Sequence, residues 1–158
     1  ASVFVLILCL PKLVKFRHAF SVPEGWAGLL YHQGKFVEAL RAGQHVRWGR
    51  KFTMNLTDLR KSSAVVPGQE VLSADNVGIK ASLLLTYQVV DPVKAAHDTQ
   101  NWLGDLYHAA QVALRAVAGG ATIESLLGQR VDIGAQLVAR VKGAAERIGV
   151  NILAIEVR

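Results

Sequence analysis

The order of structural signals along the 158 residues predicts an α+β fold. Extended segments separated by tight turns fill the chain up to about residue 90, and the hydrophobic period then changes from two to about 3.6. Asp91-Pro92 marks the change, because Asp is a good helix cap and Pro suits the first helical position. With 51% hydrophobic residues, the chain can bury a sizeable core as one domain or as two small subdomains.

The first strands are short, and turns that contain glycine connect them. We expect them to form a small antiparallel sheet. The predicted strands span residues 26–32, 36–40, 45–48 and 52–59.

A long, half-buried strand follows over residues 77–89, where apolar and polar residues alternate. The turn Ser73-Ala74-Asp75-Asn76 connects it to an earlier extended run, since Asp and Asn favour turns. Its predicted buried face consists of Val77, Ile79, Ala81, Leu83, Leu85, Tyr87 and Val89.

Two amphipathic helices are predicted over residues 102–118 and 129–148, with a short helical turn capped by Thr122 between them. Gly149 ends the second helix, and a strand completes the chain. The core face of the second helix is predicted to hold Val131, Gly134, Leu137, Val138, Val141, Ala145 and Ile148. Small residues on the opposite helix faces would let a neighbouring subunit approach closely: Ala109, Ala116, Ala135, Ala139 and Ala144.

The chain opens with an apolar run over residues 3–10, far shorter than the ~20 residues that a membrane-spanning helix needs. We expect it to be the end of a longer membrane segment, although a buried strand or helix end also fits. Basic residues follow at once, and such groups favour the cytoplasmic, anionic leaflet, although a solvated strand face fits them too. The predicted membrane-contacting residues are Val3, Phe4, Val5, Leu6, Ile7, Leu8, Leu10, Lys12, Lys15 and Arg17.

These patterns divide the chain into three parts. A membrane-associated segment covers residues 1–11, a β-rich subdomain covers 12–90, and a helical subdomain that ends in a strand covers 91–158.

The formal charge of +6 is concentrated in the first part of the chain. Residues 1–62 contain ten Lys or Arg and three acidic residues, whereas residues 63–158 contain eight and nine. An anionic partner would therefore meet the first part. Acidic lipid is favoured over nucleic acid, because the cations adjoin the apolar run and most nearby aromatic residues alternate with Val and Leu, as core residues do. A soluble nucleic-acid-binding or adaptor module is the alternative.

No pattern in the sequence points to catalysis. The five histidines lack the spacing of a metal site, the glycines form no phosphate-binding loop, and the single cysteine excludes an internal disulfide. We therefore expect a protein that is not an enzyme and that uses no cofactor or metal.

Short motifs occur in a consistent order through most of the chain. They are Val22-Pro23-Glu24-Gly25, Gln33-Gly34-Lys35, Ala42-Gly43-Gln44-His45-Val46, Leu56-Thr57-Asp58-Leu59-Arg60, the segment 65–92, Leu114-Arg115, Leu126-Leu127 and Gly149-Val150. In this order and spacing they resemble the SPFH or Band 7 domain shared by stomatins, prohibitins and flotillins, and the stomatin-like slipins above all.

The resemblance implies a fold in which amphipathic helices pack on a twisted antiparallel sheet, with a coiled coil beyond residue 158. It also implies a membrane scaffold whose copies form large rings or cages. Several family members are associated with membrane proteases, and bacterial ones often accompany a small partner membrane protein. The expected location is a membrane, the inner one in a bacterium, with the domain facing the cytoplasm.

Overall fold

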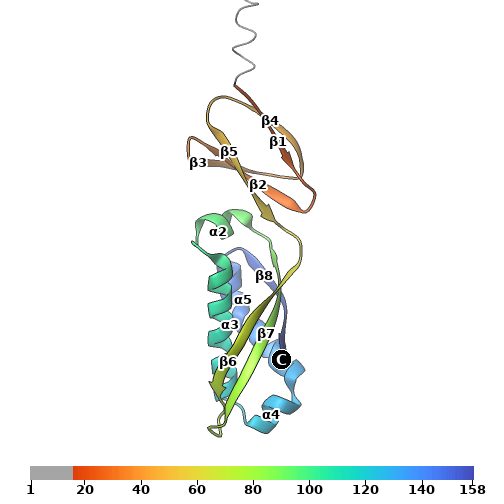
Figure 1. Cartoon of the computed structure of the whole chain (residues 1–158), viewed down its shortest axis with the longest axis vertical. Coiled ribbons are helices and arrows are strands. Elements are labelled where there is room, and N and C mark those ends of the chain that lie inside the picture. Colours follow the sequence, from red (N-terminus) through yellow and green to blue (C-terminus); the bar gives the residue numbers. More distant parts are fainter. Residues whose placement is uncertain (1–15) are drawn as a thin grey trace, which may run out of the picture. The chain divides into compact units, whose positions relative to one another are not determined.

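A computed structural model describes residues 16–158, which form two compact units. The described part of the first unit, up to Leu59, consists of strands and turns, and the second unit, from Arg60 to Arg158, combines strands with four helices (Figure 1). The expected α+β class is therefore confirmed. The apolar segment expected at the start lies outside the described residues, and the subdomain boundary at residue 90 stays a prediction.

The strands of the first unit form two small sheets, where the sequence predicted one. A two-stranded sheet pairs β1 with β4, and a second antiparallel sheet has the order β3-β2-β5. The prediction was wrong because alternation within a strand does not reveal which other strand it pairs with. The strands are β1 (Arg17–Val22), β2 (Trp26–His32), β3 (Lys35–Leu40), β4 (Gly43–Trp48) and β5 (Phe52–Asp58).

The two sheets of the first unit share one hydrophobic core. Its centre consists of Val22, Leu30 and Leu40, one from each of β1, β2 and β3. Larger, partly buried side chains from β1, β2 and β5 pack around these three: Phe20, Trp26, Phe52 and Met54.

The second unit is built on a three-stranded antiparallel sheet in the order β6-β7-β8. The alternation predicted for the long strand is confirmed within β7, since Leu83, Leu85 and Val89 are buried on one face. Val77 is a correction: it precedes the strand and is 41% exposed. The last strand of the chain pairs with β7, and Ile155 is the partner of Leu85. The strands are β6 (Ser62–Leu72), β7 (Gly78–Val89) and β8 (Val150–Val157).

Side-chain caps begin three of the helices. Asp91 accepts from the Lys94 N–H at 3.2 Å and Thr122 from the Ser125 N–H at 3.4 Å, which confirms both predicted caps. Asn101 caps α3 in the same way, and the sequence reasoning missed it. The helices are α2 (Pro92–His97), α3 (Trp102–Gly119), α4 (Ile123–Gly128) and α5 (Arg130–Arg147).

The two long helices cover one face of this sheet, where α3 contacts β6, α5 contacts β8 and the helices contact each other (Figure 1). The predicted core face of α5 needs one correction. Val131 is 87% exposed, whereas Ile133 is buried. The reason is helical spacing: Ile133 precedes the buried Leu137 by four residues and therefore lies on the same face.

Candidate interaction surfaces

Most of the residues predicted to contact a membrane lie outside the described part of the chain. These are Val3, Phe4, Val5, Leu6, Ile7, Leu8, Leu10, Lys12 and Lys15. Arg17 is the exception: it is the first residue of β1, its side chain is exposed, and its partner on β4 is Trp48. Within residues 16–158, no helix has the length and apolar character needed to cross a membrane.

Three segments of the first unit meet where β1 begins. The Gly49 N–H donates to the Phe16 carbonyl oxygen at 2.8 Å, and the Gln33 N–H donates to the Lys51 carbonyl oxygen at 3.0 Å. The guanidinium carbon of Arg50 lies 4.8 Å from the centre of the Phe16 ring, a cation–π contact. These contacts hold the start of β1, the β2–β3 turn and the β4–β5 turn together.

We call this region the basic end and define it by Arg17, Lys35, Trp48, Arg50 and Lys51, whose side chains are all exposed. No acidic residue occurs in its three segments, residues 16–18, 32–36 and 48–52. Its potential is therefore positive, and it presents one tryptophan ring to solvent.

The opposite end of the same unit has a different charge. There, Trp26 is the partner of Asp58, and the Leu59 N–H donates to the Gly25 carbonyl oxygen at 2.8 Å. Glu24 is exposed in this turn. The β3–β4 turn lies at this end too and carries the exposed Arg41. The strands of the first unit thus run from a basic end without carboxylates to an end of mixed charge.

Most aromatic residues of the first unit pack inward, as the alternation predicted. Phe20 and Phe52 pack against the core, and the His32 ring stacks on Phe52 with 4.5 Å between the ring centres. Two rings differ: Phe36 is 38% exposed and Trp48 is 58% exposed. The sequence offered one signal for Trp48: the ring ends a strand shortly before Arg50 and Lys51 in a turn.

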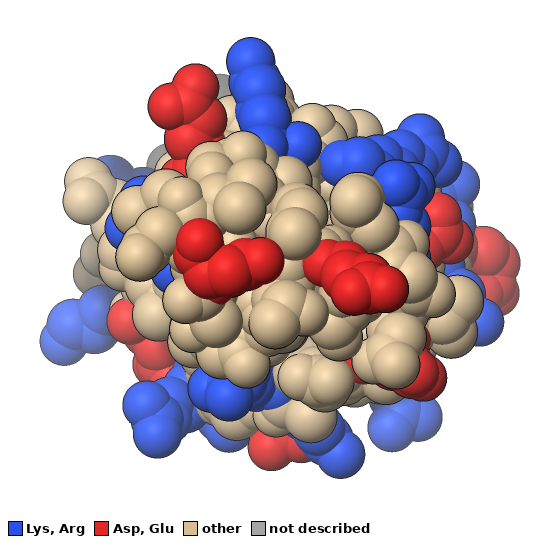
Figure 2. Space-filling model, turned by 90° about the horizontal axis from the view of Figure 1, so that it is seen from below, with Lys and Arg blue, Asp and Glu red and all other residues tan. Residues whose placement is uncertain are grey.

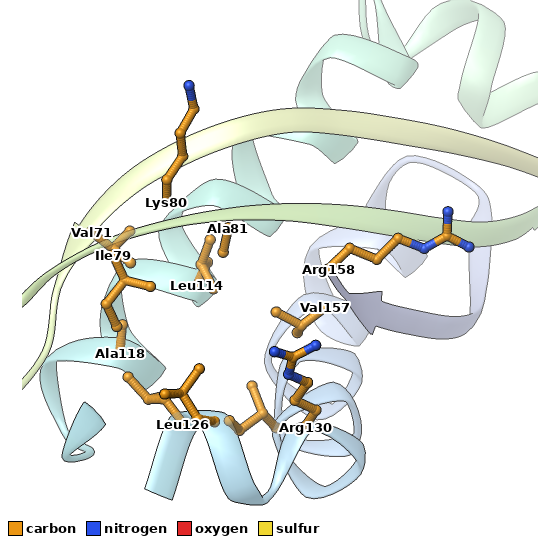
Figure 3. A pocket seen from close by; sticks show the side chains of 12 residues that line it. Val71, Ile79, Lys80, Ala81, Leu114, Ala118, Leu126, Arg130, Val157 and Arg158 are labelled. Carbon is orange, nitrogen blue, oxygen red and sulfur yellow. The ribbon is translucent and has the colours of Figure 1, made fainter. Parts of the chain in front are cut away.

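The second unit contains a small apolar cavity of about 80 Å³. Figure 3 shows Leu114, Ala118, Leu126 and Arg130 around it, with the Lys80 ammonium group pointing away. Cofactor and substrate pockets usually measure ~300–1,000 Å³, so this space suits one aliphatic side chain and not a cofactor. The hydrophobic periodicity of the sequence did not predict this cavity.

A larger apolar groove of about 690 Å³ runs between α5 and β8. We call it the β8 groove, and Val131, Ala135, Val138 and Leu153 line it. In the described sheet β8 is an edge strand, so one side of its backbone has no neighbouring strand.

A second groove, of about 480 Å³, lies between α3 and α5. Ala109, Ala116 and Ala144 line it, three of the five small residues expected to face a neighbour. Ala135 belongs to the β8 groove instead, and Ala139 is exposed.

The described residues bring together no metal-binding cluster: within 16–158, no three His, Cys, Asp or Glu side chains could hold an ion. His18 and His32 contact the Phe52 ring, and His45 Nε2 donates to the Arg41 carbonyl oxygen at 2.8 Å. Figure 2 shows acidic and basic groups interspersed around uncharged surface on the face that it views, the lower one in Figure 1.

Comparison with known proteins supplies a family. The model of the SPFH domain/Band 7 family matches residues 20–158. The stomatin homolog of Pyrococcus horikoshii is 32% identical over 103 residues, which cover 65% of this chain and 39% of that protein. Stomatin-1 of Caenorhabditis elegans is 31% identical over 101 residues, which cover 64% of this chain and 31% of that protein. An uncharacterized protein of Methanocaldococcus jannaschii is 26% identical over 96% of this chain and 75% of its own length.

The chain therefore spans well under half the length of the stomatin relatives that it matches.

Proposed function

Because this chain belongs to the SPFH domain/Band 7 family, we propose that it is part of a membrane-anchored scaffold protein whose copies assemble side by side into a ring or cage. Such an assembly organises a patch of membrane or encloses partner membrane proteins, for example a membrane protease or a small membrane protein. The family match over residues 20–158 is the observation that carries the proposal.

The mechanism is geometric, not catalytic. An anchor holds each subunit on the bilayer, and contacts between subunits set the shape of the assembly. The anchor consists of the apolar residues 3–10 with Lys12, Lys15 and Arg17, and anionic lipid attracts these cations. The positive-inside preference then places the domain in the cytoplasm.

The β8 groove supports the contact between subunits. An edge strand can accept a further strand from another chain, and apolar side chains beside it add buried area to that contact. Val131 and Leu153 are exposed there. The small residues between α3 and α5 allow a second close approach.

A charge placed in the β8 groove tests this proposal. We expect the full protein to leave the membrane in mild detergent as large assemblies, and Val131→Glu to shift them to smaller mass in analytical ultracentrifugation. Val90→Glu is the matched control, because Val90 is 60% exposed and does not line the groove.

Two results would count against the proposal in different ways. A strictly monomeric mass for the unaltered protein contradicts the scaffold. Equal effects of Val131→Glu and Val90→Glu leave the scaffold standing and reject the β8 groove as the contact.

A further inference from the structure

We propose that the small apolar cavity of the second unit is a docking site for a segment of another protein, which inserts one aliphatic side chain and places a neighbouring carboxylate against Arg130. We call this space the α4 cavity, because α4 forms one of its walls. The inference goes beyond the proposed assembly, which uses the β8 groove. Among the residues that line the α4 cavity are Ala81, Leu114, Ala118, Leu126, Leu127 and Arg130.

The core of the second unit fixes most walls of the cavity. Leu114 and Ala118 of α3 are buried, and so is Ala81 of β7. Two of these three wall residues are alanines, whose short side chains leave the space between α3 and the sheet unfilled. Protein interiors are normally packed as densely as crystals, so an aliphatic group that enters this space gains contacts that the wall atoms lack.

The wall formed by α4 is the one through which a side chain can enter. No residue of this six-residue helix is buried, and Leu127 is 56% exposed. The start of α4 is held by the Thr122 cap and by the hydrogen bond from the Ile123 N–H to Asp75. Elements with few buried side chains open locally at low free energy. Displacement of Leu126 and Leu127 therefore opens the cavity while the walls from α3 and β7 stay in place.

Arg130 supplies a cation beside this apolar space. It is the first residue of α5, and its side chain is exposed. Within residues 16–158 its guanidinium group has no hydrogen-bond or ion-pair partner. The residue borders both the α4 cavity and the β8 groove. A carboxylate that arrives beside the cavity would form a charge-assisted hydrogen bond with this group.

The other charged groups around the cavity do not take this role. The Lys80 ammonium group points away from the cavity (Figure 3), and the Arg158 guanidinium lies 3.8 Å from the Glu156 carboxylate. The first turns of α4 and α5 carry Glu124 and Asp132, which do not line the cavity. The lining thus contains no carboxylate that would neutralise Arg130.

Size and charge together define the occupant. A space of about 80 Å³ suits the side chain of leucine or isoleucine, whereas the acyl chain of a membrane lipid is several times longer. An apolar pocket with one cation beside it favours a ligand whose aliphatic group stands next to a carboxylate. A protein segment meets both conditions where an aliphatic residue ends the chain or is followed by Asp or Glu.

A titration followed by methyl NMR tests the proposal on the whole chain. The probe is N-acetylleucine, which joins an aliphatic side chain to a carboxylate. We expect it to shift the methyl signals of Leu114, Ala118 and Leu126. N-acetylleucinamide, which lacks the charge, and N-acetylalanine, which lacks the aliphatic side chain, should bind at least several-fold more weakly.

Variants of the chain separate the charge from the cavity. Arg130→Gln should bind N-acetylleucine and N-acetylleucinamide equally. Arg140→Gln is the matched control and should keep the preference, because Arg140 is exposed on the same helix and does not line the cavity. Ala118→Val should fill the space and abolish binding of both probes, and Ala81→Val fills it from the sheet in case the helix variant does not fold.

The outcomes are independent of the proposed function. Unchanged methyl signals with N-acetylleucine overturn the docking site, and so does undiminished binding to the folded valine variants. Equal binding of N-acetylleucine and its amide to the unaltered chain overturns the role of Arg130. Tighter binding of octanoate than of N-acetylleucine at the same methyl groups assigns the cavity to a fatty acid and also overturns the inference. The assembly is tested separately by Val131→Glu in the β8 groove.

Discussion

At the scale of single residues, the turn between β6 and β7 depends on Ser73, the one buried polar residue among those described. Its hydroxyl donates to Asp75 Oδ1 and accepts from the Val77 N–H at 3.1 Å. The same carboxylate oxygen accepts from the Ile123 N–H at 3.2 Å. The turn is thereby tied to the start of α4.

Replacing Ser73 should weaken this turn. Ser73→Ala leaves the Val77 N–H without its acceptor and removes a donor to Asp75, so we expect a loss of about 1–2 kcal/mol in the free energy of unfolding, measured in urea. Ser63→Ala, at an exposed position of β6, is the control and should change stability by less than about 0.5 kcal/mol. Equal effects of the two variants would contradict a structural role for the Ser73 hydroxyl.

Asp75 should make stability depend on acid pH. The hydrogen bond from Ser73 lowers the pKa of Asp75 below its ordinary value, as do the N–H groups of Asp75 and Ile123, while partial burial opposes them. A lowered pKa means that the charged form stabilises the fold, so this contribution is present at neutral pH and is lost as the pH falls below about 4.

Melting temperatures across pH measure this contribution. We expect Asp75→Asn to melt below the unaltered chain at pH 7 and the difference to shrink below about pH 4. Asp98→Asn, at an exposed aspartate after α2, is the matched charge control. A difference for Asp75→Asn that stays constant down to pH 2 would falsify the assignment.

At the scale of elements, α5 approaches β8 so closely that one helical position has room only for glycine. A Cβ on Gly134 would lie 2.4 Å from the carbonyl oxygen of Ile155. Because the obstacle is backbone, a side-chain rotation does not relieve it, and α5 would have to move away from the sheet. Gly143, in the same helix, has no heavy atom within 4 Å of such a Cβ.

The two glycines should therefore respond in opposite directions to alanine. We expect Gly134→Ala to lower the free energy of unfolding by about 1–3 kcal/mol, the usual range for overpacking. Gly143→Ala should raise it by about 0.5–1 kcal/mol, because alanine is the better helix former. Denaturant unfolding of both variants checks the pair, and a loss of stability in both would show that helix propensity does not explain the Gly143 position.

At the scale of the whole molecule, charge is distributed unevenly between two parts of the chain. Residues 1–62 carry the excess of cations, and residues 63–158 are close to neutral. The basic end gathers part of that excess on one surface. Attraction to anionic lipid is therefore expected to depend on this first part and to be screened by salt.

Salt dependence tests the electrostatic part of membrane binding. Raising the ionic strength from 0.1 M to 1 M shortens the Debye length from about 10 Å to about 3 Å, so we expect binding of the chain to phosphatidylglycerol vesicles to weaken several-fold in a sedimentation assay. Binding to pure phosphatidylcholine vesicles, the control, should change little. If salt leaves the binding to both lipids unchanged, the cations do not contribute to it.

Local features of this protein could be predicted well from the sequence alone. The caps at Asp91 and Thr122 and the alternation of β7 involve residues within a few positions of one another. Short segments of sequence are therefore enough to predict them. The order of the short motifs along the chain also predicted membership of the SPFH domain/Band 7 family, which the match over residues 20–158 confirms.

Contacts between distant segments were decided by the tertiary structure alone. The pairing of β1 with β4, the hydrogen bond from Ile123 to Asp75 and the close approach of Gly134 to Ile155 join residues that lie 20 to 50 positions apart. The basic end is of the same kind, because the start of β1 and two turns bring Arg17, Trp48 and Arg50 together. Periodicity within a segment indicates which of its faces is apolar. It does not indicate which other segment covers that face, because many different pairings would bury the same apolar area.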